Sequence, residues 1–147
     1  MTSDQIIAKL PYKPPFLFVD GISSIDENGA TGYYVFDEQH DFYKGHFIGN
    51  PVTPGVILTE TMAQIGVVSL GIYLLKDALE QDTAIALTSV EIEFLKPVYP
   101  NEKVTVVSQK KYYRFGKLKC NVTMTNEQDD VVCTGTIAGM VVFNNIK

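Results

Sequence analysis

Residues 53–75, TPGVILTETMAQIGVVSLGIYLL, decide the fold. Apolar side chains cover nearly every side of this stretch when it is drawn as a helix, and such a helix is surrounded by protein instead of lying on a surface. Thr53 offers a side-chain oxygen for the helix cap, and Pro54 suits the first helical position, where no amide hydrogen is needed. We therefore expect a buried helix from Pro54 to about Leu75, in which two glycines permit close packing.

Strands on both sides of this helix are predicted by runs of β-branched and aromatic residues that polar turns interrupt. The expected strands cover residues 16–25, 29–36, 83–98, 102–115, 117–126 and 131–143. The last three follow one another through short turns and predict an antiparallel meander. We therefore predict an α+β fold, in which one curved antiparallel sheet of five to six strands wraps a long central helix. No repeat or linker divides residues 1–147, so we expect a single domain.

The remaining segments are less regular. Ser3 or Asp4 can cap a short helix that runs to Ala8, after which the prolines of LPYKPPF, residues 10–16, break regular structure and predict an arm. Residues 37–53 show neither a helical nor a strand period, and we expect an irregular loop there.

The overall charge argues against a broad nucleic-acid-binding face. The 147 residues carry a formal net charge of -5, whereas nucleic-acid-binding domains usually show an excess of lysine and arginine. One stretch has the opposite sign, because residues 96–119 hold seven basic side chains and one acidic side chain, Glu102. An acidic protein partner could dock at this stretch.

The cysteines and the chain start bear on cofactors and location. Cys120 and Cys133 lie in predicted strands, and their number and spacing match neither a disulfide framework nor a zinc site. We expect reduced thiols, no metal and no cofactor. MTSDQIIAKLPYKPP lacks the apolar region of a secretory signal, and the apolar run 65–75 is about half of the ~20 residues that a membrane span needs. We predict a cytoplasmic protein without a membrane span.

Glu60 is the first candidate catalytic residue. It lies about 9 Å into the predicted helix, at 1.5 Å per residue, in apolar surroundings. Burial disfavours the charged form of a carboxyl group, so we expect Glu60 to hold a proton near neutral pH and to act as an acid. Gln64 follows one helical turn later and can hydrogen-bond this carboxyl group. Alternatively, Glu60 lies on a wetted stripe of the helix and has no chemical role.

His46 is the second candidate. Imidazole exchanges protons near neutral pH, so a loop histidine can act as a general base, although a histidine in an irregular loop can also be without function. His40, in DEQHDF, has acidic neighbours, and we expect a solvated loop residue there.

The helix start supplies a third component between these two residues. The first amides of a helix have no internal acceptor, so Gly55 and Val56 present N–H groups, and Gly55 has no side chain to block access. A base, an acid and a pair of amides suit the removal of a proton α to a carbonyl, with loss of the β hydroxyl as water.

Residues 45–64, GHFIGNPVTPGVILTETMAQ, resemble the signature of the FabZ-type 3-hydroxyacyl-acyl carrier protein dehydratases, HF-P-G-x-P-x-x-P-G-V followed by E-x-M-A-Q. LPYKPPFLFVD and VEIEFLKPVYPNEKV resemble further segments of that family, so the likeness runs over most of residues 10–143. The resemblance implies a hotdog fold. It also implies that His46 is the catalytic histidine, that Glu60 is the catalytic glutamate, and that the Gly55 amide holds the thioester oxygen.

The resemblance further implies the reaction and the assembly. A (3R)-hydroxyacyl chain on an acyl carrier protein would become a trans-2-enoyl chain, in fatty acid or related lipid synthesis. In the family the histidine of one subunit acts with the glutamate of the other, which implies a homodimer, or a trimer of dimers, with the acyl chain in an interface tunnel. Related dehydratase/isomerases carry aspartate, so Glu60 implies dehydration without isomerisation.

An acidic acyl carrier protein would give the basic stretch a role. Lys96 and Arg114 are the preferred docking candidates, because strand alternation prevents all the basic side chains from lining one site. They could instead be solvated residues that discourage pairing between strand edges.

Two departures from the signature concern the loop and the tunnel lining. Ile48 stands where the family usually has proline, and Thr53 and Thr59 are polar where the family tends to be apolar. Two other functions stay open: a hotdog acyl-CoA or acyl carrier protein thioesterase, and a non-catalytic acyl-binding hotdog protein. His46 and the loop of glycines and prolines favour dehydration over hydrolysis.

Overall fold

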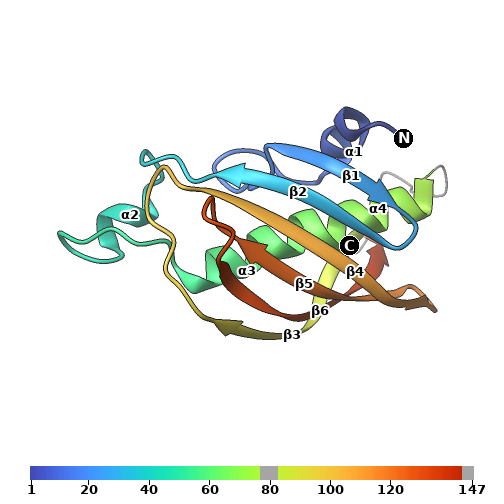
Figure 1. Ribbon diagram of the computed structural model, residues 1–147. Coiled ribbons are helices and arrows are strands. Elements are labelled where there is room, and N and C mark those ends of the chain that lie inside the picture. The colour runs from blue at the N-terminus through green and yellow to red at the C-terminus, as the bar shows by residue number, and fades with distance from the viewer. Residues whose placement is uncertain (77–82, 144–147) are drawn as a thin grey trace.

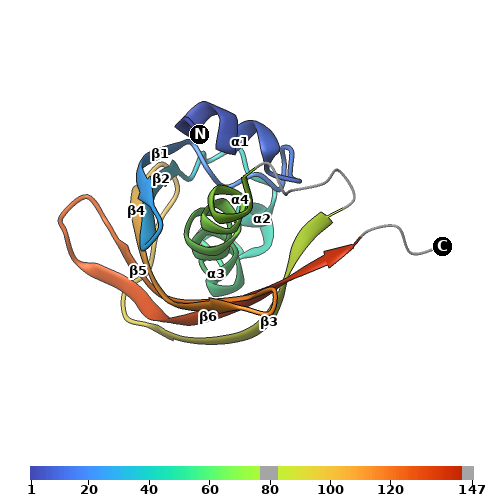
Figure 2. The ribbon, with the colours of Figure 1, turned by 90° about the vertical axis from the view of Figure 1, so that its right-hand side faces the viewer.

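A six-stranded antiparallel sheet curls around one helical column (Figures 1 and 2). The computed structural model describes residues 1–76 and 83–143. Its helices are α1 (Ser3–Lys9), α2 (Phe42–Gly45), α3 (Gly55–Ala63), the π-helical turn η1 (Gln64–Val68) and α4 (Ser69–Leu75). Its strands are β1 (Gly21–Asp26), β2 (Gly29–Val35), β3 (Thr83–Phe94), β4 (Lys103–Arg114), β5 (Lys117–Thr125) and β6 (Val131–Phe143).

The sheet has the strand order β1-β2-β4-β5-β6-β3, and every neighbouring pair is antiparallel. The predicted α+β class and the β4-β5-β6 meander are therefore confirmed. Figure 2 looks along the helical column and shows the sheet as a cup around it, with α1 over the open side. This is the hotdog arrangement that the resemblance implied. β1 begins at Gly21, later than predicted, because part of the preceding backbone hydrogen-bonds to the side chain of Gln64.

The helical column runs from α3 through η1 to α4 and ends at Leu75, as predicted, but its cap differs. Pro54 is the cap residue, with φ -58° and ψ 139°, and the helix begins at Gly55. Thr53 does not cap the helix because its hydroxyl group hydrogen-bonds to the hydroxyl group of Tyr43, at 2.6 Å. The 21 residues Gly55–Leu75 could span a membrane by length and composition alone, but 72% of their most apolar 18-residue stretch is buried inside the protein, as in a core helix.

The π-helical turn interrupts the column and was not predicted. The N–H of Ser69 donates to the carbonyl of Gln64, five residues back, and the Ser69 hydroxyl donates to the same oxygen at 2.7 Å. At this turn Gly66 lies against the sheet, where an added Cβ would be 2.9 Å from the Cβ of Ser108. Gly71 likewise faces a side chain of β3. The close packing predicted for the two glycines is confirmed.

The first helix belongs to the core and is not a free arm. Thr2 is its cap and forms a capping box with Gln5, so the predicted cap at Ser3 or Asp4 was wrong by one or two positions. Ile6 is fully buried, and α1 contacts β1 and α4. Its apolar side chains therefore help to close the open side of the sheet.

Both cysteines lie in strands as free, buried thiols, as predicted. Burial raises the pKa of Cys120 and of Cys133 to about 12, so both thiols remain protonated. The Sγ of Cys133 lies 3.8 Å from the sulfur of Met62 and 3.9 Å from that of Met124. These side chains pack as part of the core.

Candidate active site

Glu60 projects from α3 into a largely apolar environment. Its carboxyl group lines a pocket of about 400 Å³, whose other lining residues are Val56, Thr59, Leu87, Val90, Ile92 and Phe94. Burial raises the pKa of Glu60 above its ordinary value, and a hydrogen bond from Gln64 acts in the opposite direction. The Gln64 Nε2 donates to Glu60 Oε2 at 3.0 Å, which is the contact expected from their spacing. The environment thus favours a protonated carboxyl group, as an acid requires.

Gln64 is fully buried, and its amide orientation is fixed from two further sides. Its Oε1 accepts the N–H of Phe18 at 2.8 Å, and its Nε2 also donates to the carbonyl of Phe16 at 3.0 Å. Because the oxygen already accepts from Phe18, the nitrogen must face Glu60. The backbone of the N-terminal segment therefore orients the acid, through contacts over 46 and 48 positions that no local sequence pattern predicts.

Tyr12 is a second residue near Glu60 that sequence reasoning did not select. Burial raises the pKa of Tyr12 to about 12, and the negative charge of Glu60 adds to the effect. Its ring lies 6.3 Å from that of Phe16, centroid to centroid. The segment that was predicted to be an arm thus contributes a phenol to the surroundings of the acid.

His46 follows the short helix α2, inside the segment that was predicted to be an irregular loop. Four residues are too short to show a helical period, which is why α2 was missed. The Nδ1 of His46 lies 2.8 Å from the carbonyl oxygen of Val52. A carbonyl can only accept, so Nδ1 carries the hydrogen and Nε2 is left as the acceptor. The half-buried imidazole therefore has the tautomer that a general base needs.

The start of α3 presents two free amide groups. The carbonyl of Pro54 accepts the N–H groups of Ile57 and Leu58, at 2.9 and 3.1 Å. Within the part of the chain that the structure describes, the N–H groups of Gly55 and Val56 have no such acceptor. Gly55 opens onto a second pocket, of about 420 Å³, which is also lined by Thr53, Leu58, Phe94, Leu95, Lys96 and Pro97. The amides can polarise a carbonyl oxygen placed there.

The candidate residues fall into two groups. Glu60 and Gly55 line two pockets that share Phe94, so the acid and the Gly55 amide both lie near this side chain of β3. His46 is not among the described residues that line either pocket. A single chain therefore does not bring the base into the same pocket as the acid.

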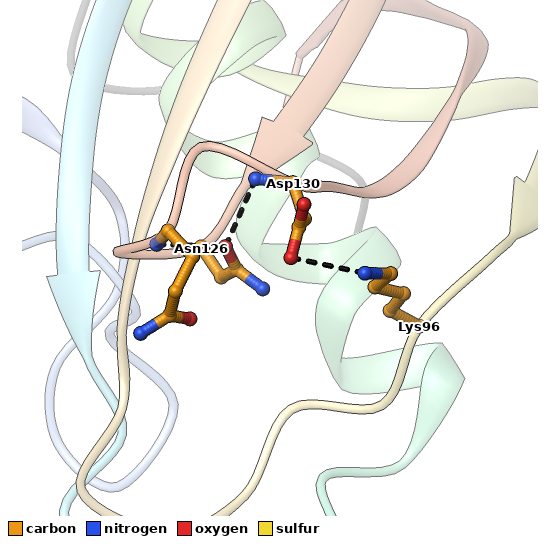
Figure 3. Close-up of polar contacts among 4 residues, drawn as sticks. Lys96, Asn126 and Asp130 are labelled. Carbon is orange, nitrogen blue, oxygen red and sulfur yellow. Dashed lines mark hydrogen bonds and ion pairs between the residues drawn. The ribbon is translucent and has the colours of Figure 1, made fainter.

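Lys96 is one of the residues that line the Gly55 pocket, and Figure 3 shows its ion pair with Asp130. Its Nζ is 2.9 Å from Oδ2 of Asp130, and Lys96 holds the pKa of that carboxyl group below its ordinary value. Asn126 fixes the turn by accepting the N–H of Asp130 at 3.0 Å. Lys96 thus has an acidic partner of its own.

Arg114 is at the opposite end of β4 from the β3–β4 connection that carries Lys96 (Figure 1). Its guanidinium lies over the ring of Tyr112, 4.4 Å from the ring centroid. Within one chain, Lys96 and Arg114 therefore do not share a surface, contrary to a single docking patch on one subunit.

His40 is not the solvated residue that its acidic neighbours suggested. It is half-buried, its Nε2 lies 2.7 Å from the hydroxyl of Tyr34, and its ring stacks on Phe42 at 4.8 Å between centroids. The rings of Tyr34, from the preceding strand, and of Phe42, two positions later, account for the burial. Among residues 1–76 and 83–143, no group of three or more His, Cys, Asp or Glu side chains is arranged to hold a metal ion.

Comparison with known families decides the relationship of this chain. The family of FabA-like domains matches residues 10–136. This chain belongs to that family. The FabA-like match begins in the N-terminal segment whose backbone hydrogen-bonds to the side chain of Gln64, and it extends into β6. It therefore includes every candidate residue described above.

Curated relatives of this FabA-like chain cover nearly its full length. The 3-hydroxyacyl-(acyl-carrier-protein) dehydratase FabZ of Caldicellulosiruptor saccharolyticus is 35% identical over 138 residues, which are 90% of this chain and 93% of that protein. The protein of the same name from Rhizobium rhizogenes is 34% identical over 141 residues, which are 94% of this chain and 86% of that protein.

Solved structures show that the fold is shared more widely. A hypothetical thioesterase of Streptococcus pneumoniae with coenzyme A superposes with a TM-score of 0.62, 14% identity, and coverage of 83% of this chain and 87% of that one. The thioesterase HI1161 of Haemophilus influenzae has a TM-score of 0.57 at 15% identity, with 86% and 80% coverage. At these identities the likeness concerns the fold alone, and it supports the hotdog assignment.

Proposed function

We propose that this chain is a dehydratase that converts (3R)-hydroxyacyl chains on an acyl carrier protein into trans-2-enoyl chains, in fatty acid or related lipid synthesis. One observation carries the proposal: Glu60, whose pKa is raised by burial, lines a pocket next to the one that the Gly55 amide at the start of α3 faces. The printed function of the relatives supports the substrate class.

The proposed reaction assigns one step to each group. The Nε2 of His46 removes a proton from C2 of the thioester, while the Gly55 amide stabilises the negative charge that develops on the carbonyl oxygen. Glu60 then gives its proton to the hydroxyl group on C3, and the C3–O bond breaks as the C2–C3 double bond forms. Water and the enoyl thioester leave. The proton on His46 returns to Glu60 through solvent to complete the cycle.

The proposed enzyme is a homodimer in which His46 of one subunit serves the pocket of Glu60 in the other. Strand β3 supports this, because it is an edge of the sheet and its backbone has an unpaired side. Its side chains Val90 and Phe94 are 45% and 51% exposed, and Val56 on the neighbouring helix is 76% exposed. A second copy paired along β3 would cover this apolar surface and close the Glu60 pocket.

Docking of the carrier protein is proposed at Lys96 and at Arg114. The two residues lie at opposite ends of β4 in one chain, so a common patch would need one residue from each subunit of the proposed dimer. Such positive charges raise the rate of encounter with an acidic carrier more than they raise affinity.

The decisive test uses crotonyl and 3-hydroxybutyryl thioesters with the purified protein. Reversible change of the enoyl absorbance without release of thiol is the expected result. Release of free thiol without hydration or dehydration would identify a thioesterase, and binding without turnover would identify an acyl-binding protein. Product analysis should show only the trans-2 double bond, because Glu60 and not aspartate is the acid.

A further inference from the structure

Two buried hydroxyl groups connect the loop that carries His46 to the start of α3. Tyr43 lies in α2 and Thr53 directly precedes the cap residue Pro54. The residues are 6% and 4% exposed, and their hydroxyl oxygens are 2.6 Å apart. This hydrogen bond is the reason that Thr53 is not the helix cap, so the chain uses the hydroxyl group for another contact.

The backbone around Thr53 holds the base on one side and the amides on the other. The N–H of Thr53 donates to the carbonyl of Val98 at 2.8 Å, which ties the segment to the β3–β4 connection. The preceding residue, Val52, accepts from Nδ1 of His46 at 2.8 Å and donates its own N–H to the His46 carbonyl at 2.9 Å. The following residue begins the turn that exposes the amide of Gly55.

Tyr43 completes this arrangement from the His46 side. The N–H of His46 donates to the carbonyl of Phe42 at 3.0 Å, so α2 leads directly into the imidazole. The hydrogen bond between the hydroxyl groups of Tyr43 and Thr53 therefore fixes the position of α2 relative to the start of α3. Burial raises the pKa of Tyr43, which keeps the hydroxyl group neutral and able to hydrogen-bond.

We infer that the Tyr43–Thr53 hydrogen bond positions the imidazole of His46 relative to the amides at the start of α3. Tyr43 and Thr53 are positioning residues, since neither supplies a proton or polarises the substrate in the proposed reaction. The expected effect on kcat rests on the proposed function. The expected effect on the orientation of the imidazole rests on the geometry alone.

The buried pair responds differently to the loss of one or of both hydroxyl groups. Removing one leaves a buried hydroxyl without its partner, whereas removing both leaves two apolar side chains that can pack. A displacement of catalytic groups by about 1 Å can lower a rate about 100-fold. We therefore expect Tyr43→Phe and Thr53→Val each to lower kcat about tenfold, with KM within about twofold of wild type, and the double variant to recover to within about threefold.

Matched variants separate this effect from a general loss of hydrogen bonds. Thr53→Ser keeps the hydroxyl group and should retain kcat. Thr123→Val breaks another hydrogen bond between two hydroxyl groups, a part-buried one, because the Oγ1 atoms of Thr123 and Thr134 are 2.9 Å apart between β5 and β6. This pair is on the outer face of the sheet, opposite the buried neighbours of Thr123, and its loss should leave kcat unchanged.

The experiment measures kcat per folded protein, the thermal midpoint, and the NMR signal of the Nδ1–H of His46. In wild type this proton should exchange slowly, because Val52 accepts it, and in each single variant its signal should broaden. Single variants with lower thermal midpoints but unchanged kcat and an unchanged Nδ1–H signal would overturn the inference, as would losses that simply add in the double variant. If wild type does not dehydrate, the proposed function fails, and the NMR signal alone decides the inference.

Discussion

The base and the acid of the candidate site are held in different ways. His46 is oriented by Val52, six positions away, inside one loop. Glu60 is oriented through Gln64, whose amide is fixed by the backbone of Phe16 and Phe18, 48 and 46 positions away. The base therefore depends on local structure, whereas the acid depends on the N-terminal segment being folded onto the central helix.

The difference also concerns solvent. The acid lies in an apolar pocket whose burial raises the pKa of Glu60, while the base sits at the end of an exposed loop with Phe47 and the 92% exposed Ile48 beside it. A site divided in this way needs a surface that brings the two halves together. In the proposed dimer, the edge strand β3 would provide this surface.

The largest expected effect comes from removing the side chain of either the base or the acid. His46→Ala and Glu60→Ala should each lower kcat about 100-fold or more, as loss of a general base or acid does. If the two residues meet across the proposed dimer, randomly exchanged subunits of the two inactive variants should regain about a quarter of wild-type activity, because half of the dimers then contain one intact site of two. Mixed dimers, verified by mass, that stay inactive would contradict a shared site.

The dependence of the acid on Gln64 predicts the next largest effect. Gln64→Leu removes the orienting amide and leaves the N–H of Phe18 and the carbonyl of Phe16 without partners, so we expect a loss of about 1–3 kcal/mol in the free energy of unfolding and about tenfold in kcat. Chemical denaturation and steady-state kinetics measure both. Gln109→Leu, at an exposed position on β4, is the control. Unchanged kcat in folded Gln64→Leu would show that the long-range contact does not orient the acid.

A smaller effect concerns stability and pH. The pKa of Glu60 is raised in the folded state, so between the ordinary and the raised value the folded protein binds more protons than the unfolded one, and stability falls as pH rises. Glu60→Gln removes this proton uptake. The thermal midpoint of the variant should exceed that of wild type at pH 8, and the difference should vanish below about pH 4. Equal pH dependence in both proteins would mean that burial does not favour the neutral acid.

The smallest expected effect concerns docking. Lys96→Met should raise KM for a carrier-protein substrate by a few-fold at low salt and leave KM for a small-molecule thioester unchanged, because exposed charges mainly affect encounter. Lys9→Met, on the exposed face of α1, is the control. An equal change with both substrates would place Lys96 in the catalytic pocket and not in docking.

The fold and the local parts of the site could be predicted from sequence. Residues 53–75 carry apolar side chains on nearly every side of the helix, and this predicts that a sheet surrounds it. Gln64 follows Glu60 by four positions, which predicts that the two side chains lie side by side. The contacts of Gln64 with Phe16 and Phe18 could not be predicted, because backbone groups carry no residue-specific signal. The phenol of Tyr12 was missed for a related reason: the prolines around it indicate broken regular structure but not where the segment packs.

Other errors came from competition between alternative hydrogen bonds. Thr53 has the composition of a helix cap, yet a buried tyrosine offered its hydroxyl group a different partner. His40 has acidic sequence neighbours, yet Tyr34 and Phe42 meet it in space. In both cases a tyrosine outside the local pattern, Tyr43 for Thr53 and Tyr34 for His40, provides the hydrogen bond that the pattern did not predict.

The wide turn at η1 absorbs one residue in the central column. The N–H of Ser69 bonds to the carbonyl of Gln64, five residues back, whereas an α-helix bonds four residues back. Deleting one residue within 65–68 would restore α-helical bonding there with the same two groups paired, so Glu60 would keep its direction relative to α4 and Gly71 its place against β3. The same deletion in an uninterrupted α-helix would turn the two halves by about 100° relative to each other, so this turn is the place where the column can change in length without re-aiming the acid.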